Sequence, residues 1–515
     1  MPDLRPEPVD RSRGLIFDAL SGYARDVVEA VVFLLVTPLL ISVLGLEQYG
    51  IWSLLWAVLG VLNLLALGLG PSVVKFVADA RGRGDVGRHG RVVATLFWMY
   101  VGVGIVLLAC AIPLGLRLGS WFDLPADLHP VVAGALIVLA LRAVLILALD
   151  TFRGVLIGHG LLRVVHALWI PSHLGYLLAA FLVLPRWGDL RVVAALSLAA
   201  AVLPMLAMAA RARRLPGVSV APRFVDRGIM RELGGFSACF LIVQVSLVLA
   251  TRCDAFVIGG ALGLEAVGLY ALAMRLSEKA GQFCGHIQKA LTPVAAEYHG
   301  AGRAEELQRL WLDGARFATA FATPLLVGAI LLAEPLLVAW AGPSFAAAAP
   351  ALQWLLAATL VGVAHCSTHN VLGMGGQHRY LAGALLVAQI ANVALSLLFV
   401  RTWGISGVAA ATLAGTAPVQ VFWIQRHAAR QLGIGRVTFY RRALGPSLLP
   451  GLAMTLMLLA LSEAVSLDAV WKIALAEFLA VALFWGLFWR SGLTTAERER
   501  ILALLRRTRA SEAVA

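Results

Sequence analysis

Fourteen long apolar runs divide this sequence, and their lengths indicate what kind of protein it forms. A helix needs about 20 residues to cross the hydrocarbon of a bilayer, so fourteen spans would use roughly 280 of the 515 residues. With 60% hydrophobic and only 14% charged residues, soluble domains of this total length could not cover their surfaces. We predict an all-α polytopic membrane protein with spans near residues 27–44, 51–69, 92–114, 131–149, 165–184, 192–210, 236–258, 267–291, 317–333, 351–372, 380–400, 407–425, 444–461 and 469–489.

The basic residues predict the orientation of these spans. The net charge of +13 comes from 38 Arg and 4 Lys, which on a soluble chain would suggest nucleic-acid binding. With a cytoplasmic N-terminus, only five basic residues fall in outer segments: Arg117, Arg186, Arg191, Arg401 and Lys472. Cytoplasmic loops of membrane proteins are enriched in Lys and Arg, so topology explains the charge and no nucleic-acid partner is expected. We predict a cytoplasmic-membrane protein with both termini in the cytoplasm and anionic lipid head groups as neighbours.

Sequence signatures of enzymes and of secreted proteins are missing. No Lys follows a Gly, which excludes a Walker A loop, and the Asp-x-Asp pair of many glycosyltransferases is absent. The N-terminal segment has no signal-peptide pattern, so the first span is expected to stay in the protein. The cysteines form no Cys-x-x-Cys pair and lie in apolar runs: Cys110, Cys239, Cys253, Cys284 and Cys366. We therefore predict a protein that is not an enzyme and has no disulfide framework.

An internal repeat occurs at an offset of 218 residues. LGLEQYGIW at 44–52 matches LGLEAVGLY at 262–270 in five positions, and four later matches bring the total to nine identities in 41 positions. Six spans separate the copies, which predicts two pseudo-symmetric six-helix lobes in the same orientation. The expected division is a tail (1–22), an N-lobe (23–210), an Arg-rich linker (211–235), a C-lobe (236–425), an appended helix pair (426–489) and a C-terminal tail (490–515). Paired lobes are typical of alternating-access transporters; a channel or a structural protein is the other interpretation.

Several motifs resemble the polysaccharide-transport family of lipid-linked oligosaccharide flippases, within the multidrug, oligosaccharidyl-lipid and polysaccharide exporter superfamily. They are LGLEQYGIWSLL, GLGPSVVKFVAD, RCDAFVIGGALGLEAVGLYALAMRL and ANVALSLLFVRTWGISGVAAATL, and the resemblance covers about residues 22–425. It implies fourteen helices in two lobes that move undecaprenyl-pyrophosphate-linked sugars from the inner to the outer leaflet. It further implies a role in lipopolysaccharide or exopolysaccharide synthesis, beside a polysaccharide polymerase and glycosyltransferases.

The resemblance also bears on single residues. YARDVVEA is similar to the Arg-Asp pair of lipid II flippases, which makes Arg25 and Asp26 candidates by carry-over. Ala66 stands where the family often has an acid, so no coupling role is carried over to that position. Lys75 stands where the family often has Arg.

Ionisable residues in the spans and at their mouths form the candidate site, because a charge in hydrocarbon is costly unless it faces a wet cavity or a partner. Arginine and lysine suit the oxygens of a pyrophosphate, and the candidates are Arg25, Lys75, Arg142, Arg153, Arg252, Arg275 and Lys279. The acids that could couple transport to H⁺ or Na⁺ are Asp26, Glu29, Asp150, Asp254 and Glu278, and Glu477 is a further acid in the last span. The alternative is structural: Arg142 pairs with an acid such as Asp254, Arg275 pairs with Glu278, and the mouth residues anchor to head groups.

Other patterns favour other classes less strongly. His365 and His369 have the spacing of a metal-binding pair, but no further ligand accompanies them and no metal site is predicted. An ion-coupled multidrug exporter of the same architecture would favour an acidic cavity, against the basic set above. A membrane glycosyltransferase or polymerase is opposed by the short outer loops near 115–130 and 334–350. A non-transporting scaffold is the remaining alternative.

Overall fold

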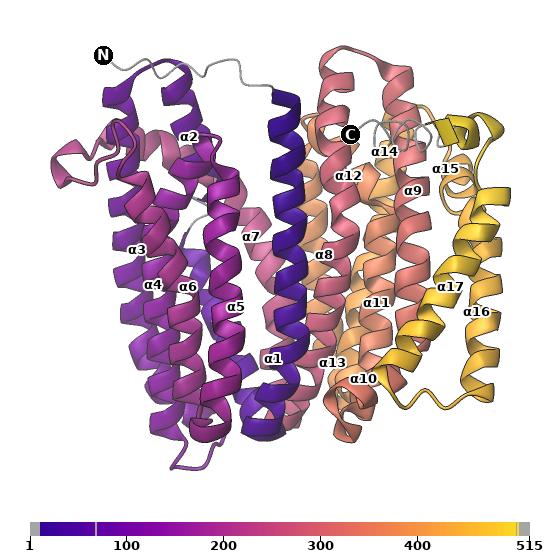
Figure 1. The fold of residues 1–515 in the computed structure, drawn as a ribbon, viewed down its shortest axis with the longest axis horizontal. Coiled ribbons are helices and arrows are strands. Elements are labelled where there is room, and N and C mark those ends of the chain that lie inside the picture. Colours follow the sequence, from indigo (N-terminus) through magenta and orange to yellow (C-terminus); the bar gives the residue numbers. More distant parts are fainter. Residues whose placement is uncertain (1–10, 67–69, 501, 504–515) are drawn as a thin grey trace, which may run out of the picture. The chain divides into compact units, whose positions relative to one another are not determined.

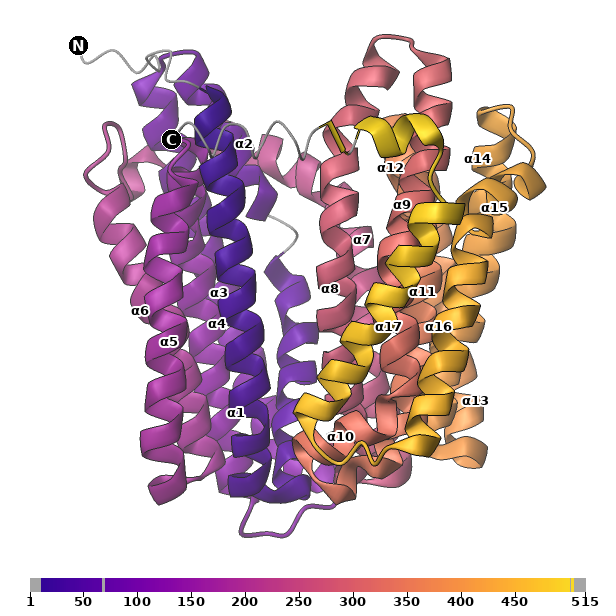
Figure 2. The ribbon, with the colours of Figure 1, turned by 45° about the vertical axis from the view of Figure 1, so that its right-hand side comes forward.

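The protein is built from helices that pack into two compact units, Met1–Ala271 and Leu272–Ala515 (Figures 1 and 2). The computed structural model describes residues 11–66, 70–500 and 502–503, and it is 89% helical, with no strand in that part of the chain. The GLG turn at 67–69 and the ends of both predicted tails lie outside the described residues. The predicted lobe boundaries, 23–210 and 236–425, stay a prediction.

The elements of each unit follow one another in simple order. The first unit contains α1 (Arg11–Leu62), η1 (Asn63–Ala66), α2 (Gly70–Gly82), α3 (Val86–Trp121), α4 (His129–Gly158), α5 (Leu162–Trp187), α6 (Leu190–Ala212), η2 (Pro222–Phe224), α7 (Arg227–Leu262) and the start of α8 (Leu264–Gly300). The second contains the rest of α8, then α9 (Ala304–Leu331), α10 (Ala333–Ala341), η3 (Pro343–Ala348), α11 (Ala349–Ala364), α12 (Cys366–Met374), α13 (His378–Pro418), the π-helix η4 (Val419–Ile424), α14 (Gln425–Gln431), α15 (Arg436–Ala443), α16 (Gly445–Ala464) and α17 (Val470–Ser491).

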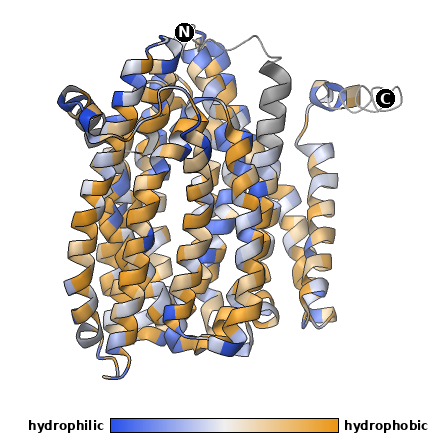
Figure 3. Ribbon diagram, turned by 60° about the vertical axis from the view of Figure 1, so that its left-hand side comes forward, coloured by the Kyte–Doolittle hydropathy of each residue, from blue (hydrophilic) through white to orange (hydrophobic). Residues whose placement is uncertain are grey.

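The described helices account for the fourteen predicted spans. Eleven of them are long and apolar enough to cross a membrane. Two of the eleven, α1 and the segment His378–Gln431, contain a non-helical glycine, Gly45 or Gly404, at which one span ends and the next begins. The 37-residue α8 is long enough but carries more charge than the others. Figure 3 shows apolar residues along the middle of the helices and hydrophilic ones gathered at their ends.

Glycines at matched positions confirm the repeat in the backbone itself. Gly45 (φ 74°, ψ 171°) and Gly263 (φ 85°, ψ 179°) are 218 residues apart and turn the chain in the same way. Gly84 (φ 68°) and Gly302 (φ 67°) are a second such pair. The N–H of each of these two bonds to the carbonyl three residues earlier, at 3.0 and 3.1 Å. Side chains are strained at positive φ, so the glycines are needed where the repeat places them.

The two LGLE corners meet backbone to backbone inside the first unit. A Cβ on Gly50 would lie 1.8 Å from the carbonyl oxygen of Leu264, and one on Gly268 would lie 2.8 Å from that of Leu46. Leu264 and Gly268 are the repeat partners of Leu46 and Gly50, so each copy makes the same contact with the other. Contacts of this reciprocal kind are what a two-fold axis produces.

The predicted linker is fixed to the first unit. Its middle packs on α3, where the indole N–H of Trp98 donates to the carbonyl of Val220 at 2.9 Å. Asp226 then caps α7, because its carboxylate accepts the N–H of Gly228 at 2.7 Å, while its own N–H donates to Thr95 at 3.0 Å. The linker is therefore a docked segment rather than a loose tether.

The second unit has two apolar clusters. In one, Trp311 of α9 stacks on Phe439 of α15 with ring centroids 4.7 Å apart, and both side chains are fully buried. In the other, Phe484 and Phe488 of α17 are buried where α17 and α16 pack on α9. The appended spans 13 and 14 thus belong to the second unit and share its core.

Candidate functional site

Four predicted site residues of the first unit form two ion pairs. Arg25 lies 2.6 Å from Asp26, and Arg153 lies 2.5 Å from Asp150. Arg25 and Arg153 are therefore each compensated by an acid that was itself a candidate for ion coupling. These pairs have the geometry of the structural alternative, in which the charges serve each other.

Arg142 of α4 is held between two other helices. Its Nε donates to the carbonyl of Ser197 on α6 at 3.2 Å, and its guanidinium carbon lies 4.8 Å from the ring centroid of Trp56 on α1. The alternative pairing of Arg142 with Asp254 is wrong, since Asp254 bonds elsewhere. Stacking on an aromatic face leaves the other N–H groups of the guanidinium, which lie in its plane, able to donate to a ligand.

Arg252 and Asp254 of α7 point to different helices, as their spacing requires. The stem of Arg252 crosses α1 at Gly60, where a Cβ would lie 2.8 Å from its Cγ. Asp254 is 2% exposed and accepts a hydrogen bond from the hydroxyl of Tyr270 on α8. Its second carboxyl oxygen has no hydrogen-bond partner in the described chain. A buried, half-satisfied acid is costly, which makes it a candidate for a functional role.

The repeat shows that the fold does not need this acid. The partners of Asp254 and Tyr270 at the offset of 218 are Val36 and Trp52, which are buried at 4% and 3% exposure. We call the two spans that meet at Gly45 the first hairpin and the two that meet at Gly263 the second hairpin. An apolar pair therefore fills the matched position of the first hairpin. The polar pair of the second hairpin carries a desolvation cost that an apolar pair does not have.

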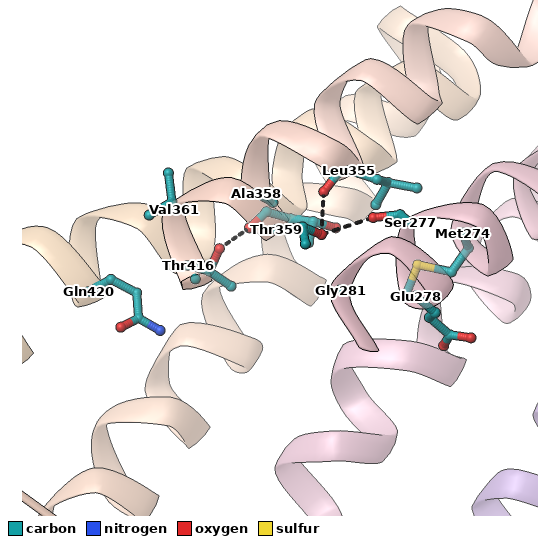
Figure 4. Close-up of a pocket in the computed structure, with 12 residues that line it drawn as sticks. Met274, Ser277, Glu278, Gly281, Leu355, Ala358, Thr359, Val361, Thr416 and Gln420 are labelled. Atoms are coloured by element: carbon teal, nitrogen blue, oxygen red, sulfur yellow. Dashed lines mark hydrogen bonds between the residues drawn. The ribbon is translucent and has the colours of Figure 1, made fainter. Parts of the chain in front are cut away.

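The second unit contains a cavity of about 280 Å³ (Figure 4). Its walls come from α8, α11, α13 and the π-helix η4, and π-helical turns in membrane helices often mark functional positions. The lining residues are Met274, Ser277, Glu278, Gly281, Leu355, Ala358, Thr359, Val361, Gly362, Thr412, Thr416 and Gln420. Glu278 is the single charged group among them.

The hydroxyl groups of this cavity donate their protons within the protein. Thr359 donates to the carbonyl of Leu355 at 2.9 Å, so the 2.9 Å bond between Ser277 and Thr359 has Ser277 as its donor. Thr416 donates to the carbonyl of Thr412 at 2.6 Å. A hydroxyl whose proton is used in this way can only accept from a ligand. Together with the carboxylate of Glu278, the cavity therefore suits ligands that donate hydrogen bonds or carry positive charge.

The remaining predicted residues lie on α8, α2 and α1. No ion pair joins Arg275 to Glu278 within the part of the chain that the structure describes, so that alternative is wrong. Lys279 of α8 donates to Gln282 at 3.3 Å. Lys75 is exposed on α2 with its Nζ 5.6 Å from the Phe76 ring centroid, and Glu29 is half-buried on α1.

The two histidines of spacing four are bonded to protein groups. His365 contacts the carbonyl of Val361 at 2.8 Å and the hydroxyl of Tyr440 at 3.1 Å. His369 contacts the side chain of Gln420 at 2.8 Å, which orients that amide at the cavity wall. No group of three or more metal-ligating side chains occurs in the described residues. Both rings thus have roles in the polar core of the second unit.

Glu477 of α17 is inserted against a glycine of α9. A Cβ on Gly328 would lie 1.9 Å from its Oε2, and neither carboxyl oxygen has a hydrogen-bond partner among the described residues. The glycine makes room for the acid. A carboxyl group without a hydrogen-bond partner in a span is costly, as it is for Asp254.

The cavity residues without charge were missed by sequence reasoning, which considered only ionisable groups. A signal did exist: Thr412, Thr416 and Gln420 follow one another at four-residue intervals and so share one helix face. The hydroxyls of Ser277 and Thr359 come from different helices, and only the fold brings them together.

These features define a class of protein: a polytopic helical membrane protein with a duplicated scaffold, polar groups inside its spans and no strand in the described chain. The chain belongs to the polysaccharide biosynthesis protein family, whose model matches residues 19–299. It is 22% identical over 487 residues to the uncharacterized membrane protein EpsK of Bacillus subtilis (strain 168), covering 92% of this chain and 94% of that protein.

Solved structures share the fold. The lipid II flippase MurJ, in an inward closed conformation, matches with a TM-score of 0.71 at 11% identity, covering 92% of this chain and 99% of that one. An inward-facing multidrug resistance transporter of the MATE family and the MOP superfamily matches with a TM-score of 0.69 at 17% identity, covering 78% and 94%. The chain therefore shares the fold of these two transport proteins.

Proposed function

We propose that this protein moves a polyprenyl-pyrophosphate-linked oligosaccharide from the inner to the outer leaflet of the cytoplasmic membrane for surface polysaccharide synthesis. The observation that carries the proposal is the pair of half-buried arginines, Arg142 and Arg252, held inside the first unit of a chain from a polysaccharide biosynthesis family. Arginine offers several donors in one plane, which suits the oxygens of a pyrophosphate. The lobes would expose these groups to each leaflet in turn.

Two further groups fit this proposal. Arg252 depends on Gly60 for its place, since a side chain there would displace its stem. Asp254 has one unsatisfied oxygen that could take up a proton or Na⁺ as the lobes move. Transport would then be driven by an ion gradient, and no resident cofactor is required.

The test is transport of a labelled lipid-linked oligosaccharide in proteoliposomes. We expect Arg252→Ala to abolish it and Gly60→Ala to slow it by up to about 100-fold, because a misplaced guanidinium no longer meets the phosphate. The control is Gly102→Ala, since a Cβ there has no neighbour within 4 Å. In cells, deletion of the gene should trap the lipid-linked oligosaccharide in the inner leaflet. Normal surface polysaccharide in a deletion strain without a paralogue would sink the proposal.

A second candidate function is export of amphiphilic cations, and the cavity of the second unit favours it. That cavity has one acidic residue, Glu278, and no basic residue in its lining. We expect Glu278→Gln to weaken binding of a fluorescent cationic dye if this is the transported class. Unchanged dye binding in the variant, or none in the wild type, would exclude it.

A further inference from the structure

One long stretch of the chain has no acidic residue. No Asp or Glu occurs between Glu334 and Glu463, although 29 are present in the whole sequence. The stretch carries seven basic residues, all Arg: one at residue 379, one at residue 401 and five between residues 426 and 442. The six other than Arg401 are considered together. A charge imbalance of this size within one segment indicates a partner of opposite charge.

The fold gathers these six arginines at one end of the second unit. They lie at the start of α13, on α14 and on α15, and both views place α14 and α15 at the end of the unit opposite α10 (Figures 1 and 2). All six are exposed: Arg379, Arg426, Arg430, Arg436, Arg441 and Arg442. We call this group the arginine surface. None of its members takes part in an ion pair in the described ranges of the chain.

The elements beneath the arginine surface are fixed by packing. Phe439 anchors α15 in the core, and Tyr380 of α13 stacks on His427 of α14 with ring centroids 3.9 Å apart. The side-chain amide of Gln308 on α9 donates to the carbonyl of Leu432 at 2.7 Å, which holds the connection between α14 and α15. A rigid support lowers the entropy lost when several arginines bind one partner.

Apolar side chains are exposed beside the arginines. Val437 of α15 is 81% exposed, and Phe422 and Trp423 of η4 are 63% and 45% exposed. A surface with arginines next to exposed aromatic and aliphatic groups is typical of the interface between head groups and acyl chains. Soluble acidic partners would offer nothing to cover the apolar residues.

Some exposed arginines elsewhere are compensated within the protein. Arg83 lies 3.0 Å from Asp79, Arg91 lies 3.6 Å from Asp226, and Arg309 lies 3.9 Å from Glu305. Each of these arginines has an acid within reach in its own unit. The arginine surface differs because the stretch of chain that carries it contains no acid.

We propose that the arginine surface binds the phosphate head groups of anionic phospholipids, with Val437 and its aromatic neighbours entering the acyl region. The site tethers the segment that joins the twelve-span body to α16 and α17. This proposal does not depend on what the protein transports, so it is tested separately from the proposed function.

The test compares two variants of equal charge in nanodiscs of phosphatidylcholine with or without phosphatidylglycerol. One is Arg436→Gln, Arg441→Gln and Arg442→Gln; the matched control is Arg83→Gln, Arg91→Gln and Arg309→Gln. Hydrogen exchange of residues 436–443 and the number of phosphatidylglycerol molecules retained in native mass spectrometry are measured.

We expect phosphatidylglycerol to slow exchange of this segment in the wild type and in the control. The first variant should lose that response and bind the lipid at least about 10-fold more weakly, since each arginine near an anionic surface contributes substantially. An equal loss in the control would show a general charge effect and overturn the proposal, as would a wild type that ignores phosphatidylglycerol. If the first variant does not fold, Arg426→Gln with Arg430→Gln on α14 gives the same readout.

Discussion

The two hairpins that carry the LGLE corners have the same backbone turn, but apolar residues of the first are replaced by charged residues in the second. Apolar residues Leu34, Val36, Ala57 and Val61 of the first correspond to Arg252, Asp254, Arg275 and Lys279 of the second at the offset of 218. Because the first hairpin forms with apolar residues at these four positions, the charges of the second are not needed there to build the hairpin. The duplication thus separates what the scaffold requires from what has been added to it.

The strongest test of this comparison replaces Asp254 and Tyr270 of the second hairpin by the valine and tryptophan found at the matched positions of the first. We expect Asp254→Val with Tyr270→Trp to leave the unfolding temperature nearly unchanged and to reduce transport to background. Circular dichroism and the proteoliposome assay measure the two effects. Asp254→Asn, which keeps an acceptor for Tyr270 but cannot exchange a proton, separates charge from shape. Full transport by the double variant would remove Asp254 from the mechanism.

The reciprocal glycine contact predicts a smaller effect, on stability. Gly50→Ala places a methyl group against the backbone oxygen of Leu264, so we expect a loss of about 1–3 kcal/mol from the crowding. Gly268→Ala should cost less, because the matching distance is longer. Gly260→Ala, where a Cβ meets nothing within 4 Å, is the control. Equal stability of all three variants in thermal unfolding would contradict the contact.

The smallest effect concerns the hydrogen bonds that attach the linker and the segment after α17 to the helices of each repeat. Trp98 bonds to the linker, and its repeat partner Arg316 instead pairs with Glu497 near the C-terminus. Partial burial alone would raise the pKa of Glu497, but the backbone N–H of Thr494 and the guanidinium of Arg316 lower it below its usual value.

A lowered pKa gives a stabilising contribution that is present above the ordinary pKa of glutamate, near 4.3, and is lost as the pH falls through the folded value. We therefore expect the wild type to lose stability below about pH 4.3. Glu497→Gln should lose less over that range, whereas Trp98→Phe should not alter the pH profile. Identical profiles of the wild type and Glu497→Gln would contradict the role of the pair.

Much of the fold could be predicted from the sequence because the membrane imposes a fixed span length. The apolar runs located the fourteen spans but not the short helices α2, α10, α14 and α15. The LGLE match located two of the glycine corners, at Gly45 and Gly263. The long α8 was also placed, although its charges, Arg275 and Glu278 among them, weaken its apolar signal. The sequence did not indicate the interaction partners of the charged residues. Arg142 contacts Trp56 and Ser197 rather than Asp254. An aromatic face or a backbone carbonyl can stabilise a charge, and residue spacing indicates neither.

The candidate site was predicted less completely for a related reason. The candidates were found because they are ionisable residues within or next to predicted spans. The position of a residue along a helix, however, does not show which neighbouring side chain it contacts. The stem of Arg252 lies against Gly60, and the carboxyl group of Glu477 lies against Gly328. Small residues that make room for a charge leave no mark in a hydropathy pattern.

The single-glycine corners at Gly45, Gly263 and Gly404 have a consequence for how the protein is made. A pair of spans joined by one residue has no loop that could pass through the translocation machinery separately. Each such pair must enter the bilayer as a preformed hairpin, since a half-inserted corner would leave its backbone groups unsatisfied in hydrocarbon. An epitope tag inserted at these corners should block insertion, whereas the connection after Ala464 has several residues in which to accept one.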